Sequence, residues 1–301
     1  IALMAGELKP GDEVLFCSHT MVATASAIHF AGGKPIPVDT SSDHLIDLVS
    51  AELSISRNTK AIMPTQLNGR TANMDAVSEF AERHGLKIFE DAAQSLGSKF
   101  KGKSAGTFGI GSAISFYPAK TLGSLGDAGA VLTNDSDVYE RLLLLRDHGR
   151  GEDGDVHMWG FNTRMDNLQA AFLNKSLDKY DQVVARRREL ASRYHERLND
   201  IDALRLPPAP DEGDHFDIFQ NYEIEAGDRD GLKEYLGSQG VGSLIQWGGK
   251  AVHQFRQLGF DQELPKTEEM FKKLLMIPLN MSLRDEDVDY VALKIREYYE
   301  R

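Results

Sequence analysis

Short apolar runs alternate with amphipathic stretches over residues 13–150 of the chain. Each apolar run is long enough for one strand, and six strands are expected, at residues 13–16, 34–38, 60–64, 87–90, 113–116 and 129–133. Helices are expected at residues 20–31 and 74–84, each followed directly by glycine. Strands that alternate with helices of about ten residues are typical of a mostly parallel sheet with helices on both faces. Ligand sites of such α/β sheets lie at the carboxyl ends of the strands.

The second half of the chain follows a different pattern. One long helix is expected at residues 165–198, followed by a Pro-rich connector at residues 206–213. Beyond it we expect a strand at 219–224 and helices at 228–239 and 285–299. These patterns predict a large α/β domain over residues 1–205 and a smaller α+β domain over residues 206–301. The chain opens inside a helical pattern at Ile1, so we expect that an N-terminal portion of the large domain is missing.

Composition narrows the classes of function. The 301 residues are 41% hydrophobic and 27% charged, which is ordinary for a globular protein with a sizeable core. No apolar run reaches 18 residues, so no transmembrane helix is expected. A formal charge of −12 disfavours nucleic acid and anionic membranes as partners. The single cysteine, Cys17, fits a reducing compartment, so a cytoplasmic location is expected.

Two residues that follow expected strands carry the candidate chemistry. Asp91 comes directly after one strand, and Lys120 lies just past another, in a turn shaped by Pro118 and Gly123. A partly desolvated lysine can form a Schiff base, and a carboxylate in the same cleft can keep a pyridine nitrogen protonated. Pyridoxal phosphate chemistry needs this pair, because the ring withdraws electrons only when its nitrogen is charged. Taken singly, Asp91 could instead cap a helix over residues 92–96, and Lys120 could be a solvated surface residue.

Longer motifs around these two residues resemble a known family. They lie at residues 90–94 (EDAAQ), 106–109 (GTFG), 115–123 (SFYPAKTLG), 126–130 (GDAGA), 146–149 (RDHG), 160–165 (GFNTRM) and 168–171 (LQAA). Over nearly its whole length the chain resembles the DegT/DnrJ/EryC1/StrS sugar-nucleotide aminotransferases. The resemblance implies the type I fold of pyridoxal-phosphate enzymes, that of aspartate aminotransferase, with a mostly parallel central sheet and a smaller C-terminal α+β domain.

The resemblance also implies roles for individual residues. Lys120 would bond covalently to pyridoxal 5′-phosphate and move protons once it is released. The other expected cofactor-binding residues are Asp91 at the pyridine nitrogen, Gln94 at the phenolic oxygen, Ser115 at the phosphate, Asn162 at the phosphate of a neighbouring subunit, and Met21 where the family has an aromatic residue on the ring. The role of Asn162 requires a homodimer with shared active sites. No metal-binding residues are expected.

These roles predict a transaminase. It would move an amino group, through the pyridoxamine 5′-phosphate form of the cofactor, from L-glutamate to a nucleotide-linked 4-keto-6-deoxy or 3-keto sugar, and release 2-oxoglutarate. The same fold also serves enzymes that act on cyclitol ketones or aminoketones, and sugar dehydratases that carry His at the Lys120 position. A regulator without enzyme activity would be expected to lack Lys120 or Asp91. Trp247 and His253 lie in a stretch that faces substrate in the family, although Trp247 could equally pack at a domain interface.

Overall fold

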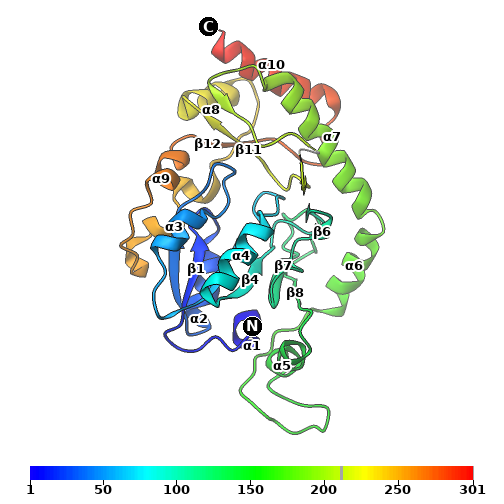
Figure 1. Ribbon diagram of the computed structural model, residues 1–301. Coiled ribbons are helices and arrows are strands. Elements are labelled where there is room, and N and C mark those ends of the chain that lie inside the picture. Colours follow the sequence, from blue (N-terminus) through cyan, green and yellow to red (C-terminus); the bar gives the residue numbers. More distant parts are fainter. Residues whose placement is uncertain (211–212, 301) are drawn as a thin grey trace.

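A six-stranded sheet forms the centre of the protein. The computed structural model describes residues 1–210 and 213–300, and its central sheet has the strand order β2-β1-β3-β4-β7-β8 (Figure 1). The strands are β1 (Glu13–Cys17), β2 (Lys34–Val38), β3 (Thr59–Met63), β4 (Lys87–Asp91), β7 (Gly111–Ser115) and β8 (Gly129–Leu132). The first five in the sheet run parallel, and β8 pairs antiparallel with β7. The predicted mostly parallel sheet is confirmed, with each of its six predicted strands in place, whereas the strand predicted at 219–224 lies at Tyr222–Ala226 in another sheet.

Helices cover both faces of this sheet. The helices of this part are α1 (Ala2–Ala5), α2 (Val22–Phe30), α3 (Leu48–Leu53), α4 (Met74–His84) and α5 (Ser136–Arg146). Alternate residues of β1 point to opposite faces, as in any strand. Leu15 packs in the apolar cluster under α4, whereas Val14 and Phe16 pack in the cluster under α2. All five residues of β1 are buried, as expected for an inner strand of a parallel sheet.

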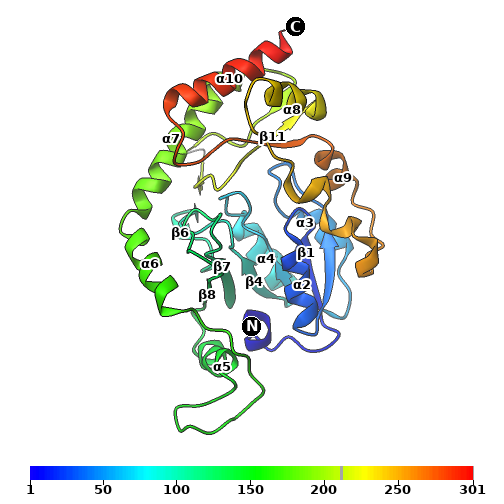
Figure 2. The same ribbon diagram turned by 180° about the vertical axis from the view of Figure 1, so that it is seen from behind.

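The single long helix predicted for residues 165–198 is wrong, because two helices occupy this range. They are α6 (Asn167–Leu177) and α7 (Tyr180–Leu198), and Lys179 between them has non-helical φ and ψ of −114° and 6°. Tyr180 is buried, and its hydroxyl donates to the carbonyl oxygen of Leu96 at 2.6 Å. This anchor fixes the chain at the start of α7. Both helices then run along one side of the molecule towards α10 (Figures 1 and 2).

The C-terminal part contains an antiparallel sheet with the strand order β12-β11-β9. Its elements are β9 (Leu204–Arg205), β11 (Tyr222–Ala226), α8 (Arg229–Ser238), three short 3-10 turns that include η1 (Gln246–Gly249), α9 (Pro265–Phe271), β12 (Leu274–Ile277) and α10 (Asp285–Tyr299). The three short strands β5 (Lys99–Phe100), β6 (Lys103–Ser104) and β10 (His215–Phe216) form a third sheet. The predicted helices at 228–239 and 285–299 are confirmed.

The division into two domains stays a proposal. The apolar cluster beneath the C-terminal sheet also takes in Leu190, Tyr194 and Leu198 from α7, so this helix contributes to both parts of the chain. Residues 211–212 of the predicted connector, and residue 301 at the end of the predicted small domain, lie outside the described residues. Within the described ranges, none of the helices combines the length and the hydrophobicity that a membrane span needs.

Candidate active site

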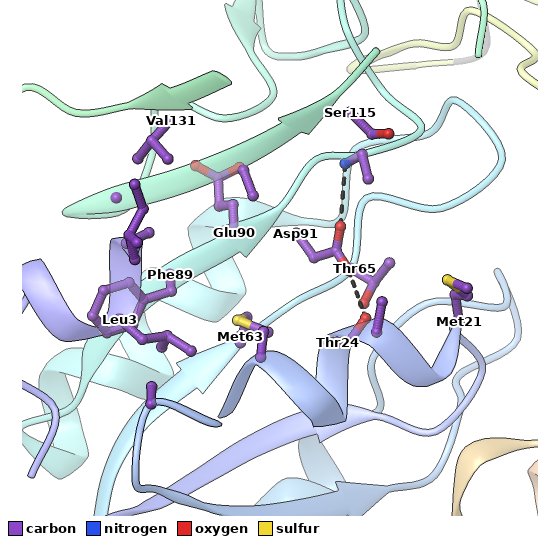
Figure 3. A pocket seen from close by; sticks show the side chains of 18 of the residues that line it. Leu3, Met21, Thr24, Met63, Thr65, Phe89, Glu90, Asp91, Ser115 and Val131 are labelled. Atoms are coloured by element: carbon purple, nitrogen blue, oxygen red, sulfur yellow. Dashed lines mark hydrogen bonds between the residues drawn. The ribbon is translucent and has the colours of Figure 1, made fainter. Parts of the chain in front are cut away.

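One cavity at the carboxyl ends of β4 and β7 collects the residues that the sequence singles out. Its volume is about 1060 Å³. All of the predicted site residues line it, namely Met21, Asp91, Gln94, Ser115, Lys120 and Asn162. Figure 3 shows Asp91 in the middle of this cavity, between Ser115 of β7 and Thr24 of α2. The roles of these residues stay predictions, but the fold brings together side chains that are up to 141 positions apart.

Two donors hold the carboxylate of Asp91. The hydroxyl of Thr24 donates to Oδ2 at 2.5 Å, and the backbone N–H of Ala93 donates to Oδ1 at 3.2 Å (Figure 3). Thr24 is itself hydrogen-bonded to Thr20 at 2.8 Å, and Thr65 donates to Thr20 at 3.2 Å. The alternative role as a helix cap is wrong, because residues 92–96 form turns rather than a helix. Asp91 is therefore oriented by its neighbours and accessible from the cavity.

Lys120 lies at the end of a tight turn after β7. Its backbone N–H donates to the carbonyl oxygen of Tyr117 at 2.8 Å, and its side chain is half-buried. Burial lowers the pKa of the Lys120 amine below its usual value, and the nearby charge of Asp91 offsets part of this effect. A lysine that loses its proton more readily than usual is the form needed for attack on a carbonyl carbon.

The side chain of Gln220, about a hundred positions later in the sequence, fixes the backbone on both sides of Lys120. The amide oxygen of Gln220 accepts from the backbone N–H of Thr121 at 2.8 Å, and its amide nitrogen donates to the carbonyl oxygen of Ala119 at 3.0 Å. The buried guanidinium of Arg187 donates to the carbonyl oxygens of Phe219 and Gln220. No sequence motif points to Gln220, because its partners lie about a hundred positions away.

Gln94 is oriented through its oxygen. Its Oε1 accepts from the backbone N–H of Asn68 at 2.9 Å and from the side-chain amide of Asn221 at 3.4 Å. This arrangement leaves the Nε2 group of Gln94 as a donor for a ligand oxygen. Asn68 and Asn221 are therefore supporting residues that sequence reasoning missed.

The other three predicted residues also line the cavity. Ser115 ends β7, and its hydroxyl oxygen accepts from the N–H of Tyr117 at 3.3 Å, which leaves the hydroxyl proton for a ligand. Met21 precedes α2 and is 52% exposed. Asn162 is exposed and lies between α5 and α6, where it forms an isolated bridge with Asp147.

Glu90, next to Asp91, has a structural role that sequence reasoning also missed. Its buried carboxylate accepts from the backbone N–H groups of Gly106, Phe108 and Gly109 at 2.7 to 3.1 Å, and from the side chain of Gln66 at 2.8 Å. These bonds explain why the motif at 106–109 accompanies the motif at 90–94. Both acids touch the cavity, but the buried carboxylate of Glu90 holds the loop at 106–109, whereas Asp91 is only part-buried.

Trp247 and His253 do not line this cavity. The Trp247 ring lies against the rings of His19 and Phe271, with centroids 5.7 and 6.5 Å apart. His253 is fully buried, and its Nδ1 lies 2.7 Å from the hydroxyl of Ser18. These contacts support the packing interpretation of Trp247.

The lowered pKa of Lys120 predicts selective modification. Lys101 is the natural comparison, because its hydrogen bond to Asp75 raises the pKa of that amine and its side chain is 52% exposed. In cofactor-free protein held one or two pH units below 10.5, a larger fraction of Lys120 is neutral, so reductive methylation should label Lys120 severalfold faster than Lys101. Peptide mass spectrometry of timed samples measures both rates. Faster labelling of the exposed Lys101 would contradict the lowered pKa of Lys120.

Comparisons with known proteins agree with this geometry. The model of the DegT/DnrJ/EryC1/StrS aminotransferase family matches residues 1–296. A pleiotropic regulatory protein of Geobacillus stearothermophilus is 36% identical over 99% of this chain and 82% of its own length. A dTDP-3-amino-3,4,6-trideoxy-alpha-D-glucose transaminase of Streptomyces venezuelae is 35% identical over 100% of this chain and 80% of its own. The X-ray structure of Streptomyces venezuelae DesV in complex with a ketimine intermediate, also 35% identical, matches all of this chain and 81% of that one with a TM-score of 0.94. This likeness confirms the predicted fold.

Proposed function

Because the chain belongs to the DegT/DnrJ/EryC1/StrS aminotransferase family, we propose that it transfers an amino group from L-glutamate to a keto group of a nucleotide-linked deoxysugar. The family depends on pyridoxal phosphate, and we assign this cofactor and its pyridoxamine form to the cavity. The observation that carries the proposal is the half-buried amine of Lys120 in one cavity with the oriented carboxylate of Asp91. The Streptomyces venezuelae relative, named for a dTDP-linked amino sugar, supports the sugar-nucleotide substrate.

The lining of the cavity fits the cofactor. Asp91 offers a carboxylate for the ring nitrogen, the free Nε2 of Gln94 suits the phenolic oxygen, and the hydroxyl of Ser115 suits the phosphate. The exposed thioether of Met21 can lie against an aromatic ring, although an aromatic side chain would give more contact. When bound, the cofactor supplies a positively charged ring that withdraws electrons from the bonds at the reacting nitrogen.

The protein's own groups then position charges and move a proton. Thr24 and the N–H of Ala93 donate to the carboxylate of Asp91 and fix its orientation in the cavity. Lys120, with its lowered pKa, can accept a proton from one carbon and return it to another. Gln220 limits the movement of the backbone around Lys120, so that the amine stays in a fixed position relative to the cavity.

Two other candidate functions are less well supported. The dehydratases of this fold carry His where this chain has Lys120. The Geobacillus relative is named as a regulatory protein, but a regulator without activity has no need for the Lys120 and Asp91 pair that this chain retains. We also propose a cytoplasmic location, because the chain has a single cysteine and such a chain suits a reducing compartment. The thiol of this residue, Cys17, is buried, and burial raises its pKa to about 12.

A panel of acceptors tests the proposal. The chain is supplied with pyridoxal phosphate and L-glutamate, and with dTDP- or UDP-linked 4-keto-6-deoxy and 3-keto sugars or a cyclitol ketone. We expect 2-oxoglutarate and an amino sugar in equal amounts from at least one nucleotide sugar. Turnover of the cyclitol ketone alone would favour the second substrate class, and loss of a sugar hydroxyl without gain of nitrogen would favour a dehydratase.

We also propose a homodimer in which Asn162 reaches the phosphate bound by its partner. Tyr117 and Phe161 line the cavity yet are exposed, and Leu125 and Leu168 are exposed as well. Exposed apolar side chains of this kind are typical of a surface that another chain covers. Mixing and refolding Lys120→Ala and Asn162→Ala chains tests the arrangement. If Asn162 acts across the dimer, one site of each mixed dimer is complete, and about a quarter of wild-type activity returns. If Asn162 serves its own chain, no mixed dimer has a complete site and no activity returns.

A further inference from the structure

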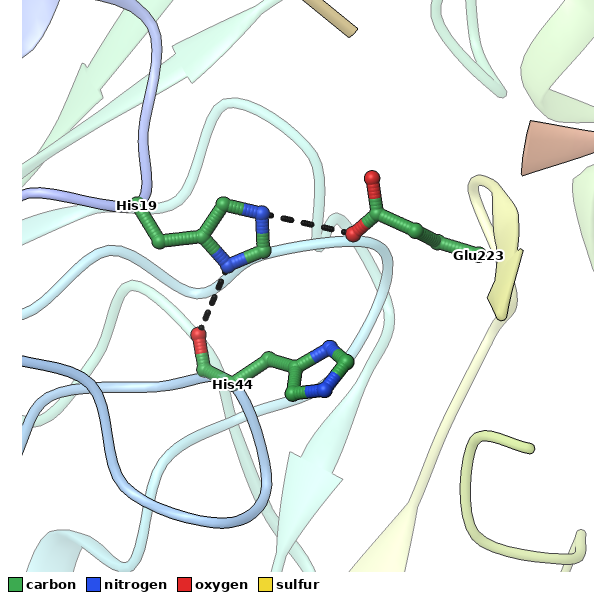
Figure 4. A group of neighbouring side chains, drawn as sticks. All are labelled: His19, His44 and Glu223. Atoms are coloured by element: carbon green, nitrogen blue, oxygen red, sulfur yellow. Dashed lines mark hydrogen bonds and ion pairs between the residues drawn. The ribbon is translucent and has the colours of Figure 1, made fainter. Parts of the chain in front are cut away.

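Outside the cavity of the proposed amino transfer, three side chains from distant parts of the sequence meet. His19 follows β1, His44 follows β2, and Glu223 lies in β11 (Figure 4). Their ligand atoms all lie within 4.8 Å of one another, and His19 and Glu223 are buried. Over residues 1–210 and 213–300, no other group of three His, Cys, Asp or Glu side chains comes together in this way.

The ring of His19 is fixed with one nitrogen facing the Glu223 carboxylate. Nδ1 lies 3.1 Å from the carbonyl oxygen of His44, which can only accept, so Nδ1 carries the proton of this bond. Nε2 lies 3.3 Å from Oε2 of Glu223, yet it has no hydrogen-bond partner although it is buried (Figure 4). A second proton on the ring would make this contact an ion pair, whereas a metal cation between the two atoms would make both of them ligands.

The ring of His44 is oriented in a similar way. Its Nε2 lies 2.8 Å from Oε1 of Glu225, which leaves Nδ1 as the nitrogen available to a ligand. A carboxylate on the second nitrogen of a histidine ring is the usual support of a metal-binding histidine, because it fixes the ring and raises its basicity. The carbonyl oxygen of His44 supports His19 in the same sense.

The carboxylate of Glu223 is held from both sides. Its Oε1 accepts from the side chain of Gln246 at 3.0 Å, and its Oε2 accepts from the side chain of Asn68 at 2.9 Å. Each oxygen keeps a second lone pair for another partner. A second cavity of about 390 Å³, lined in part by His44, Asn68 and Glu223, adjoins the group and gives a water molecule access to it.

We propose that His19, His44 and Glu223 bind one divalent transition-metal ion, zinc by the chemistry of the donors, with water from the second cavity as the fourth ligand. Two imidazole nitrogens and one carboxylate are a set that zinc takes in sites with an open position. Tetrahedral ligands at about 2.0–2.2 Å from one ion lie about 3.3–3.6 Å apart, so binding would draw the most distant of the three groups together by about 1 Å. The ion would tie the loops after β1 and β2 to β11, and it would do so whether or not the proposed amino transfer is correct.

Metal binding by the tag-free chain tests the site. Protein stripped with EDTA and dialysed is titrated with CoCl₂ and with ZnCl₂, followed by calorimetry and visible absorption. We expect one ion per chain, with the cobalt absorption of four-coordinate nitrogen and oxygen ligands, which zinc then displaces. His44→Asn and Glu223→Gln should weaken binding by at least about 100-fold, more than the loss of a supporting partner would cause. His157→Asn is the matched control, because that exposed histidine pairs with Asp153 well outside the group; it should leave binding unchanged.

Equal binding by wild type, His44→Asn and Glu223→Gln would overturn the proposal, as would a wild type that binds neither ion. X-ray absorption of zinc-loaded wild-type protein covers the case in which a variant fails to fold. A first shell of nitrogen and oxygen at about 2.0–2.1 Å with outer-shell scattering from imidazole is expected. A shell without imidazole would overturn the assignment.

Discussion

Replacing Lys120 by alanine is expected to lower amino transfer by at least about 10⁴-fold, since the proposed nucleophile and the proposed proton carrier are lost together. Alanine removes the half-buried amine, whereas the backbone hydrogen bond from residue 120 to Tyr117 and the bonds of Gln220 to Ala119 and Thr121 remain. The fold should therefore persist while the chemistry stops. Release of 2-oxoglutarate from L-glutamate, with the best acceptor of the panel, measures the loss.

A second measurement tests whether turnover falls because the covalent bond between Lys120 and the cofactor is lost. Borohydride treatment of the wild type with pyridoxal phosphate should attach the cofactor to the peptide that contains Lys120, and Lys120→Ala should carry no such adduct. Lys101→Ala, which removes an exposed amine paired with Asp75, should keep both the activity and the adduct. Turnover by Lys120→Ala within tenfold of wild type would show that Lys120 does not carry the reaction.

Asp91→Asn is expected to lower turnover by about 10²- to 10⁴-fold without loss of the fold. The amide keeps an oxygen that can accept from Thr24 or from the N–H of Ala93, but it lacks the charge that holds a ring nitrogen protonated. Turnover per site and the thermal midpoint of unfolding should therefore respond differently. A large fall in turnover with a small change in the midpoint is the expected result.

Glu90→Gln is the matched control for this experiment, one residue away on the same strand. Its carboxylate accepts from three backbone N–H groups and one side-chain amide, and glutamine offers only one acceptor oxygen in their place. We expect the free energy of unfolding to fall by about 3 kcal/mol. If Asp91→Asn lowers stability as much as Glu90→Gln does, its effect on turnover cannot be assigned to the ring nitrogen.

The central sheet could be predicted from the sequence because each strand is a continuous apolar run with turn residues at its ends. The break between α6 and α7 could not be predicted, because the helical pattern continues across residues 178 and 179. The anchor there is a hydrogen bond from Tyr180 to Leu96, and nothing local to the helix marks it. Elements set by local pattern were therefore predicted well, and those set by distant contacts were not.

The same distinction holds for the candidate site. Asp91, Gln94, Ser115 and Lys120 lie within 29 positions of one another, so the sequence alone could group them. Supporting residues such as Thr24, Asn68 and Gln220 act through hydrogen bonds to residues 26 to 101 positions away. His19, His44 and Glu223 follow no ligand spacing either, and only the fold brings them together.

The hydrogen bonds of Gln220 to residues 119 and 121 have a consequence for protein engineering. Exchange of C-terminal segments between relatives is an obvious way to alter which sugar is accepted. In this chain such a chimera would also exchange the residue that steadies the reactive amine. A donor segment without glutamine at this position should yield hybrids that bind the new sugar yet turn over slowly, so crossover points are better placed to keep Gln220 with its own Lys120 loop.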